Sequence, residues 1–217
     1  MTADHSALQP ADDAARLAAF MSALVTEHFA LQGAASTTVT EAAGRSALYF
    51  SALSSSLVAM GFAAQSTRRF APFAAAVIPT VIALGVLTAV RLVDTGVQNL
   101  TFLADIARIR GYYRSLLPDG SEYFRPWGGE QNEGDQALAA VSRKQGLLTG
   151  LGTAAAMVAA INAVVAGIGA ALATMSLTGG NTTFAGVGGI VITLIFVSGF
   201  LVYQDHRYRT AASQRQG

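Results

Sequence analysis

Few residues in this chain have the types and spacing that catalysis needs. The three histidines, His5, His28 and His206, lie far apart and lack the paired spacing of a metal-binding helix. The glycines at 186, 188 and 189 open a hydrophobic segment instead of following a strand, so they do not form a dinucleotide loop. The absence of cysteine excludes disulfides, thiolate metal sites and cysteine nucleophiles. The sequence therefore predicts a protein that is not an enzyme and holds no metal or cofactor.

Polar side chains inside hydrophobic segments are the first group with a plausible chemical role. Ser54, Ser55 and Ser56 lie in one such segment, and Asn162 lies near the middle of another. Hydroxyl and carboxamide groups in hydrocarbon need hydrogen-bond partners, which neighbouring helices or a water-filled path can supply. Two interpretations stay open: contacts between helices, and the lining of a pore.

A basic cluster with two tyrosines forms the second group. Arg108, Arg110 and Arg114 flank Tyr112 and Tyr113 on a helical spacing. The simplest interpretation is a solvated helix face with stabilising ion pairs. The alternatives are contact of Arg108, Arg110, Tyr113 and Arg114 with anionic lipid headgroups, with an anionic cytoplasmic ligand such as a nucleotide, or with a partner protein.

Composition places the chain in the membrane class. Hydrophobic residues make up 52% of the 217 residues and charged residues 12%, about half the charged share of soluble domains. The mean hydropathy is +0.44. The net charge of +1 gives no field that favours nucleic acid, so no nucleic-acid partner is expected. Acidic residues at 4, 12 and 13 and the lack of a basic start exclude a cleavable signal peptide.

Four hydrophobic segments, at about 47–64, 70–90, 147–175 and 184–203, are long enough to cross a bilayer. The second continues without a strong breaker to Leu117, which predicts one helix over 70–117 with a charged stalk beyond residue 90. Its apolar stripe needs a partner in water. Arg91 and Asp94, three residues apart, can pair along its surface. Pro79 removes a backbone hydrogen bond from this helix and is a candidate hinge.

Two further segments flank the crossings on the cytoplasmic side. Apolar residues from Asp12 to Gln32 recur with helical periodicity, which predicts an amphipathic helix that ends at Gly33 and packs on the protein's other cytoplasmic helices. Residues 33–40 are expected to form a linker. The segment 118–136 is predicted to be a loop whose aromatic residues, Tyr123, Phe124 and Trp127, dock on the bundle or lie near the headgroups.

Basic residues set the orientation. With four crossings, twelve of the fourteen Lys and Arg residues fall on the side of the termini, and only Arg68 and Arg69 fall on the other. This predicts cytoplasmic termini. The expected fold is an all-α, polytopic four-helix membrane bundle. Its divisions are a cytoplasmic N-terminal region (1–45), a first membrane hairpin (46–90), a cytoplasmic stalk and loop (91–146), a second membrane hairpin (147–203) and a cytoplasmic tail (204–217).

The pattern Arg108-x-Arg110-x-x-Tyr113 on the stalk, followed by Ile161-Asn162 and Gly167, resembles a family of four-helix bacterial integral membrane proteins of uncharacterised activity. A looser likeness exists to small SLATT-type membrane effectors. The resemblance covers most of residues 41–175 and implies a multi-pass protein of the bacterial inner membrane.

Together these features favour a homo-oligomeric channel or pore-forming membrane effector that is gated from the cytoplasm. Dense glycine and alanine in the crossings suit tight self-association. The expected partners are the lipid bilayer, further copies of the chain, and a cytoplasmic protein or anionic ligand. The alternative is a non-conducting scaffold or receptor that presents a cytoplasmic docking surface. A small transporter subunit is a third hypothesis, disfavoured because no acid or base lies inside a hydrophobic segment.

Overall fold

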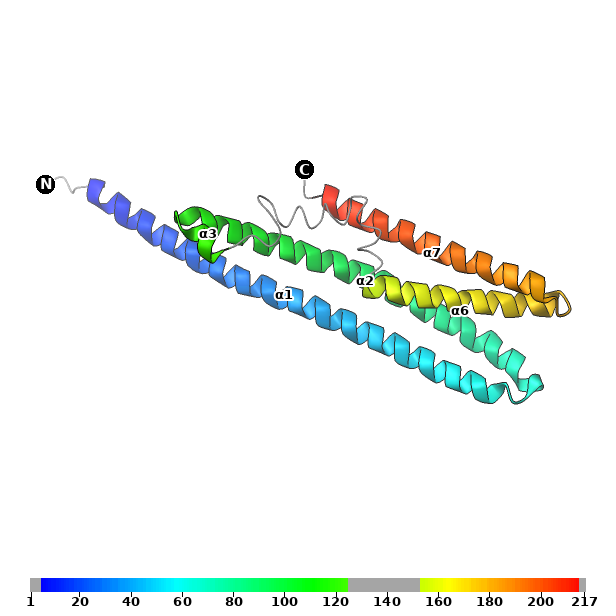
Figure 1. Cartoon of the computed structure of the whole chain (residues 1–217). Coiled ribbons are helices and arrows are strands. Elements are labelled where there is room, and N and C mark those ends of the chain that lie inside the picture. Colours follow the sequence, from blue (N-terminus) through cyan, green and yellow to red (C-terminus); the bar gives the residue numbers. More distant parts are fainter. Residues whose placement is uncertain (1–4, 125–152, 215–217) are drawn as a thin grey trace. The chain divides into compact units, whose positions relative to one another are not determined.

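The computed structural model describes residues 5–124 and 153–214, with the side chains of residues 5–11 and 67 left undescribed. Long helices account for nearly all of these residues (Figure 1). They are α1 (His5–Ala63), α2 (Thr67–Leu116), α6 (Ala154–Leu177) and α7 (Thr182–Ser213), with a single turn of helix, α3 (Gly120–Tyr123), after α2. Within this described part of the chain, four helices are long and apolar enough to cross a membrane. This confirms the all-helical fold and supports a multi-pass membrane protein.

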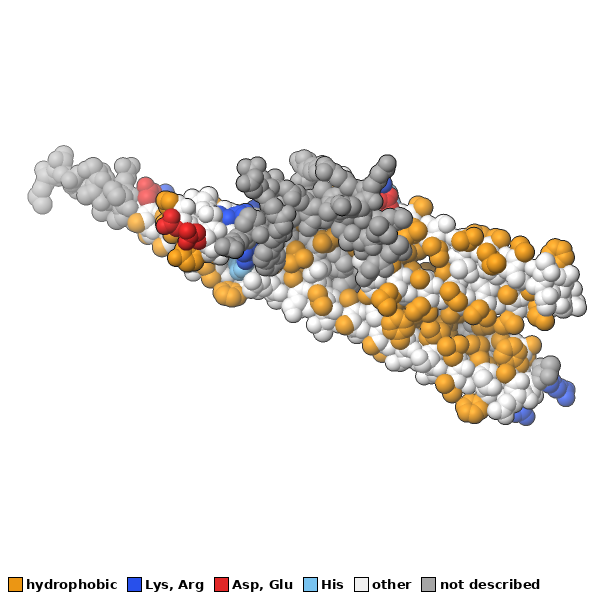
Figure 2. Space-filling model, viewed as in Figure 1, with side chains coloured by type: hydrophobic (Ala, Val, Ile, Leu, Met, Phe, Trp, Pro, Cys, Tyr) orange, Lys and Arg blue, Asp and Glu red, His pale blue; other side chains and the backbone are white. Residues whose placement is uncertain are grey.

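The helices form two compact units. The first unit joins the part of α1 that ends at Thr37 to the part of α2 that begins at Asn99, together with α3. The second unit joins residues 38–98 of α1 and α2 to α6 and α7. Figure 2 shows hydrophobic side chains covering much of the visible surface of α2 and α6 in the second unit. The crossing segments and their contacts therefore belong to the second unit.

The helix α1 is longer than the sequence predicted. It does not end at Gly33, and the expected linker at 33–40 is helical, so both of these predictions are wrong. A glycine inside a helix costs only about 1 kcal/mol relative to alanine, which a long helix tolerates. Hydroxyl side chains here also bond back to the helix, as when the Thr37 hydroxyl donates to the Gly33 carbonyl at 2.9 Å.

The helix α2 confirms the prediction of one helix over 70–117. In its first turn the amides of Arg69 and Phe70 both donate to the Ser66 carbonyl at 3.0 Å. Pro79 lies inside the helix and does not end it. After α2, the chain turns so closely that a Cβ on Gly120 would lie 2.6 Å from the Arg114 carbonyl oxygen. This turn places Phe124 against Tyr113, with ring centroids 5.3 Å apart.

The helices α6 and α7 form a hairpin whose ends are capped by side chains. The Thr153 hydroxyl accepts from the Ala156 amide at 3.2 Å, and the Asn181 carboxamide oxygen accepts from the amides of Thr183 and Phe184. Between the helices, Gly179 and Gly180 have φ of 63° and 96°, which only glycine adopts readily. The predicted third crossing began at residue 147, but residues 147–152 lie outside the described residues. The predicted fourth crossing extends as helix into the expected tail.

Candidate functional site

Asn162 lies where three membrane helices of the second unit meet. Its side chain is 2% exposed. The carboxamide nitrogen donates to the Ile82 carbonyl of α2 at 3.2 Å, and the carboxamide oxygen accepts from the Tyr49 hydroxyl of α1 at 3.4 Å. Tyr49 is itself fully buried. The polar group predicted from the sequence is therefore satisfied by hydrogen bonds within one subunit, and it joins α6 to both helices of the first hairpin.

Gly85 makes this three-helix junction possible. A Cβ on Gly85 would lie 2.9 Å from the carboxamide nitrogen of Asn162 and closer still to its carbon and oxygen. Real Cβ atoms essentially never show contacts this short. The backbone of α2 therefore approaches the Asn162 side chain as closely as it does only because residue 85 has no side chain. Sequence analysis identified Asn162 but missed Gly85 and Tyr49, since nothing in the sequence pairs these positions.

The hairpin of α6 and α7 is held by a second close approach. A Cβ on Gly167 would lie 2.8 Å from the Gly189 carbonyl oxygen, and one on Gly189 would lie 2.9 Å from the Gly167 carbonyl oxygen. The Thr193 hydroxyl lies between the helices, 2.9 Å from the Gly189 carbonyl and 3.3 Å from the Ala163 carbonyl. Small residues thus let the two backbones meet, and the Thr193 hydroxyl of α7 donates a hydrogen bond to the Ala163 carbonyl of α6.

Ion pairs near the predicted cytoplasmic ends of the crossings connect different helices. The Arg207 guanidinium of α7 binds the Asp94 carboxylate of α2, with Nε 3.1 Å from Oδ1. Arg91 lies 3.9 Å from the carboxylate of Glu41 in α1. The predicted pairing of Arg91 with Asp94 along α2 is therefore wrong, because each side chain reaches a charge on a neighbouring helix. These contacts tie the second unit together at this end.

The serine cluster is divided between the exposed surface of α1 and the side of α1 that faces α2 and α6. Ser54 and Ser55 are exposed, and the Ser55 hydroxyl donates to the Ser51 carbonyl at 2.8 Å. Ser56 is half-buried and lines a small apolar cavity of about 40 Å³ that also contacts α2 and α6. The three serines therefore do not share one environment: two face outward and one faces the helices of the same subunit.

Ser54 belongs to a longer outward face of α1 that sequence analysis missed. Exposed residues recur at alternating steps of four and three, and nearly all of them are small or carry a hydroxyl: Thr40, Gly44, Ala47, Ser51, Ser54, Val58 and Gly61. We call these seven residues the α1 seam. A Cβ on Gly44 or Gly61 would meet nothing within 4 Å. The heptad spacing, which keeps small residues on one face of the helix, could have revealed the seam.

The outward face of α7 has the opposite character. It carries large apolar side chains, among them Phe184, Ile190, Leu194 and Val202, each more than half exposed. Such a surface suits contact with lipid chains. Leu48, Leu57 and Phe62 also point outward from α1 and flank the seam. The outer surface of the second unit is therefore uneven: its exposed serines gather on α1, while both α1 and α7 expose glycines.

The predicted basic cluster lies in the first unit and does not form a single patch. Arg108 is exposed, whereas Arg110, Tyr113 and Arg114 are half-buried. At 100° per residue, Arg108 and Arg110 point to nearly opposite sides of α2. Tyr113 packs against Phe124 and against the His28 imidazole of α1, whose ring centroid lies 6.3 Å away. Phe20 of α1 likewise meets Tyr112 edge-on at 5.7 Å. The N-terminal part of α1 thus packs on α2, as its apolar periodicity predicted.

The remaining predicted residues have plain surroundings. Pro79 is exposed and lines an apolar groove between α2 and α6. Trp127 lies outside the described residues. Among the described residues, no three His, Asp or Glu side chains are grouped so that they could hold a metal ion.

Comparison with protein-family models, with curated proteins and with solved structures gives no match for this chain.

Proposed function

We propose that the chain is the subunit of a homo-oligomeric membrane channel or pore whose water-filled path is lined by the α1 seam. The observation that carries the proposal is the contrast between the outward faces of α1 and α7. The membrane part of α1 exposes the hydroxyls of Ser51, Ser54 and Ser55 among its apolar side chains, whereas the membrane part of α7 exposes mainly large apolar side chains and one serine, Ser198. Hydroxyl groups form no hydrogen bonds with lipid chains, whereas they can form them with water or with a neighbouring helix.

The seam has the chemistry of a path for water or ions. The Ser55 hydroxyl donates its hydrogen to the Ser51 carbonyl. The lone pairs of the Ser55 oxygen then remain as outward-facing acceptors. Ser51 and Ser54 add further hydroxyls one turn apart on the same face. Above and below them, Gly44 and Gly61 leave room for a second α1 helix. Copies of α1 arranged around an axis would bring these hydroxyls together and leave α7 against lipid.

Regulation is assigned to the first unit. The helices α1 and α2 each run unbroken from the first unit into the second, so a change in their packing in one unit bears on the other. An anionic ligand or a partner protein that binds near Arg110, Tyr113 and Arg114 would alter the packing of Tyr113 on His28. Cytoplasmic placement of this unit follows from the distribution of basic residues. The family resemblance described above agrees with this topology and adds no activity.

Cysteine substitution tests the path, because the natural chain contains no cysteine that would react in the background. The variants are Ser51→Cys and Ser54→Cys, with Ser198→Cys as the matched control, since Ser198 is an exposed serine on α7. Each protein is reconstituted in planar bilayers, and currents are recorded before and after a charged, membrane-impermeant thiol reagent. We expect the reagent to reduce the current of the seam variants and to leave the Ser198→Cys current unchanged.

Two results would overturn the proposal. One is equal sensitivity of the Ser54→Cys and Ser198→Cys variants, which would mean that the seam is not distinguished from the lipid face. The other is the absence of current under every voltage and ligand condition in a protein that is folded and inserted.

A second candidate, a non-conducting scaffold, is favoured by one observation in the first unit. Large apolar side chains are exposed there, including Leu17, Phe29 and Leu117. In water an exposed apolar patch marks a docking surface for another protein. Loss of a captured cytoplasmic protein on Phe29→Ser, with no current from the natural chain, would favour the scaffold over the channel.

A further inference from the structure

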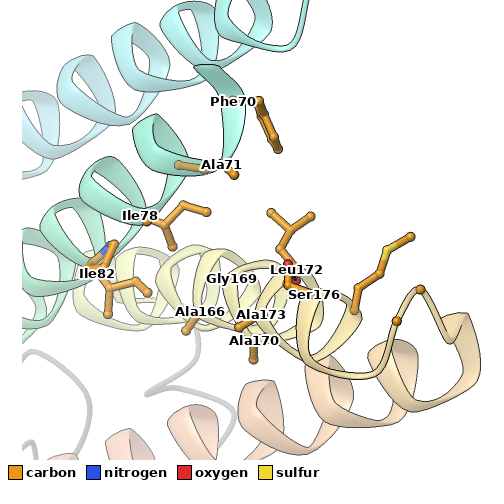
Figure 3. Close-up of a pocket in the computed structure, with 16 residues that line it drawn as sticks. Phe70, Ala71, Ile78, Ile82, Ala166, Gly169, Ala170, Leu172, Ala173 and Ser176 are labelled. Carbon is orange, nitrogen blue, oxygen red and sulfur yellow. Dashed lines mark hydrogen bonds between the residues drawn. The ribbon is translucent and has the colours of Figure 1, made fainter. Parts of the chain in front are cut away.

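The second unit contains an open apolar groove between α2 and α6, with a volume of about 890 Å³ (Figure 3). Its α2 wall includes Phe70, Ala71 and Ile78, and its α6 wall includes Gly169, Leu172 and Ser176. Figure 3 shows Phe70 and Leu172 extending from the opposite walls into the space between the two helices. The volume lies within the range that proteins use to bind small ligands.

Small residues keep this groove open. Ala71 and Ala75 on α2 and Ala173 on α6 are exposed and line it. Deeper in, the helices touch: a Cβ on Gly169 would lie 2.7 Å from the Cγ2 atom of Ile78. The helices therefore meet at their crossing and diverge toward the ends that carry the two hairpin turns.

The walls of the groove are apolar, and no side-chain hydrogen-bond donor that lines them is left unpaired. The Ser176 hydroxyl, the polar side-chain group among the lining residues, donates to the Leu172 carbonyl at 3.1 Å. Residues 60–82 and 166–182, which contain the lining, include no acidic residue. An alkyl chain is therefore the occupant whose chemistry matches the walls.

Two arginines directly precede the α2 wall of the groove in the sequence. Phe70 begins the α2 wall directly after Arg68 and Arg69, and both arginines are exposed. Figure 2 shows basic side chains at the turn between α1 and α2. These arginines also stand in the first turn of α2, where the helix dipole favours an anion. The other side of the opening is the uncharged turn of Gly179 and Gly180.

We propose that the groove binds one acyl chain of an anionic phospholipid, with the lipid phosphate at Arg68 and Arg69. Arginine is suited to this role because its planar guanidinium pairs with phosphate oxygens. The apolar slot and the adjacent cations favour a lipid over a helix of a second copy, because the predicted membrane parts of α1 (47–64) and α7 (184–203) carry no acidic side chain that would meet the arginines. This proposal does not depend on channel activity.

Native mass spectrometry of the purified, delipidated protein tests the proposal. The protein is titrated with phosphatidylglycerol and, separately, with phosphatidylcholine of the same acyl chains. We expect phosphatidylglycerol to bind more tightly. Arg68→Gln/Arg69→Gln should weaken its binding about thirtyfold, because each basic residue near an anionic headgroup contributes a factor of about five. Arg68→Lys/Arg69→Lys should retain most of the affinity.

A second variant tests whether the acyl chain binds in the groove. Ala173→Phe fills the groove from an exposed position, and Ala160→Phe is its matched control, because Ala160 is exposed on α6 but does not line the groove. We expect Ala173→Phe to reduce binding of both lipids and Ala160→Phe to change neither.

Three outcomes would overturn the proposal. The first is equal affinity for the two lipids in the natural chain. The second is unchanged phosphatidylglycerol binding in the Arg68→Gln/Arg69→Gln variant. The third is a change of oligomeric state by Ala173→Phe with lipid binding intact, measured by light scattering in detergent, which would assign the groove to a second copy of the chain.

Discussion

Replacing Gly85 with alanine is the sharpest test of the three-helix junction. The added Cβ would lie 2.9 Å from the Asn162 carboxamide nitrogen and closer to its carbon and oxygen. Asn162 is buried and fixed by two hydrogen bonds, so its side chain has no free space into which to turn. We therefore expect Gly85→Ala to displace the carboxamide from both Tyr49 and the Ile82 carbonyl.

The expected loss follows from three contributions. Overpacking a tight interior costs about 1–3 kcal/mol. Each lost interhelical hydrogen bond in a membrane adds on average about 0.6 kcal/mol. Alanine regains about 1 kcal/mol through its higher helix propensity. The free energy of unfolding should therefore fall by about 1–3 kcal/mol in total.

Unfolding in mixed micelles with increasing SDS, followed by circular dichroism, measures this free energy. Gly199→Ala is the matched control, because a Cβ at this position of α7 meets nothing within 4 Å. This control should be neutral or slightly more stable. Asn162→Ala provides a rescue: once the carboxamide is removed, Gly85→Ala should cost much less than it does in the natural chain. The two substitutions should thus be clearly non-additive.

Two results would contradict this reasoning about the junction. If Gly85→Ala and Gly199→Ala had the same free energy of unfolding, the close approach of α2 to Asn162 would not exist in the folded protein. If Gly85→Ala cost the same with and without the Asn162 carboxamide, the clash would lie elsewhere.

Further predictions concern the other contacts of the second unit. Gly167→Ala should destabilise the α6–α7 hairpin by about 1–3 kcal/mol in the same SDS assay, because its Cβ meets the backbone of Gly189. Gly188→Ala, whose Cβ meets the movable Thr174 hydroxyl at 2.9 Å, should cost less than about 1 kcal/mol. Asp94→Asn should cost about 0–1 kcal/mol, since its partner Arg207 is 43% exposed, and the cost should shrink at high salt. Asn162→Leu should lower stability but leave the conductance of an open channel unchanged, as measured in planar bilayers; a changed conductance would place Asn162 on the path.

The sequence predicted the long helices well because their signals are local. Apolar runs of sufficient length act within one segment, and α2 ends at Leu116, next to the predicted end of this helix at Leu117. The failed boundary at Gly33 shows the limit of such signals. A glycine followed by serine and threonine is typical of a helix end, but the hydroxyls of this segment bond back to helix carbonyls and the helix continues.

Contacts between helices were much harder to predict. The need of Asn162 for a partner followed from its chemistry, but Tyr49 and the Ile82 carbonyl are 113 and 80 residues away. Asp94 pairs with Arg207, which is 113 residues away, and not with Arg91, its predicted partner three residues away on the same helix. Such partners depend on how the crossings pack, which helical periodicity alone does not determine.

The location of a path for ions can be argued from what each crossing does with its polar groups. Within the described part of the chain, the Asn162 carboxamide accepts a hydrogen bond from Tyr49 and donates one to the Ile82 carbonyl. The Thr193 hydroxyl lies between two carbonyls of the α6–α7 hairpin, and the groove of α2 and α6 is lined mainly by alanine and other apolar residues. These interior polar groups thus serve packing, whereas the buried side-chain oxygen of Gln204 in α7 has no hydrogen-bond partner among the described residues. Ser51 and Ser54 are exposed instead, so their hydroxyls can contact lipid or another copy of the chain. Under the proposed channel function, this arrangement favours a path between copies along α1 over one through a single chain.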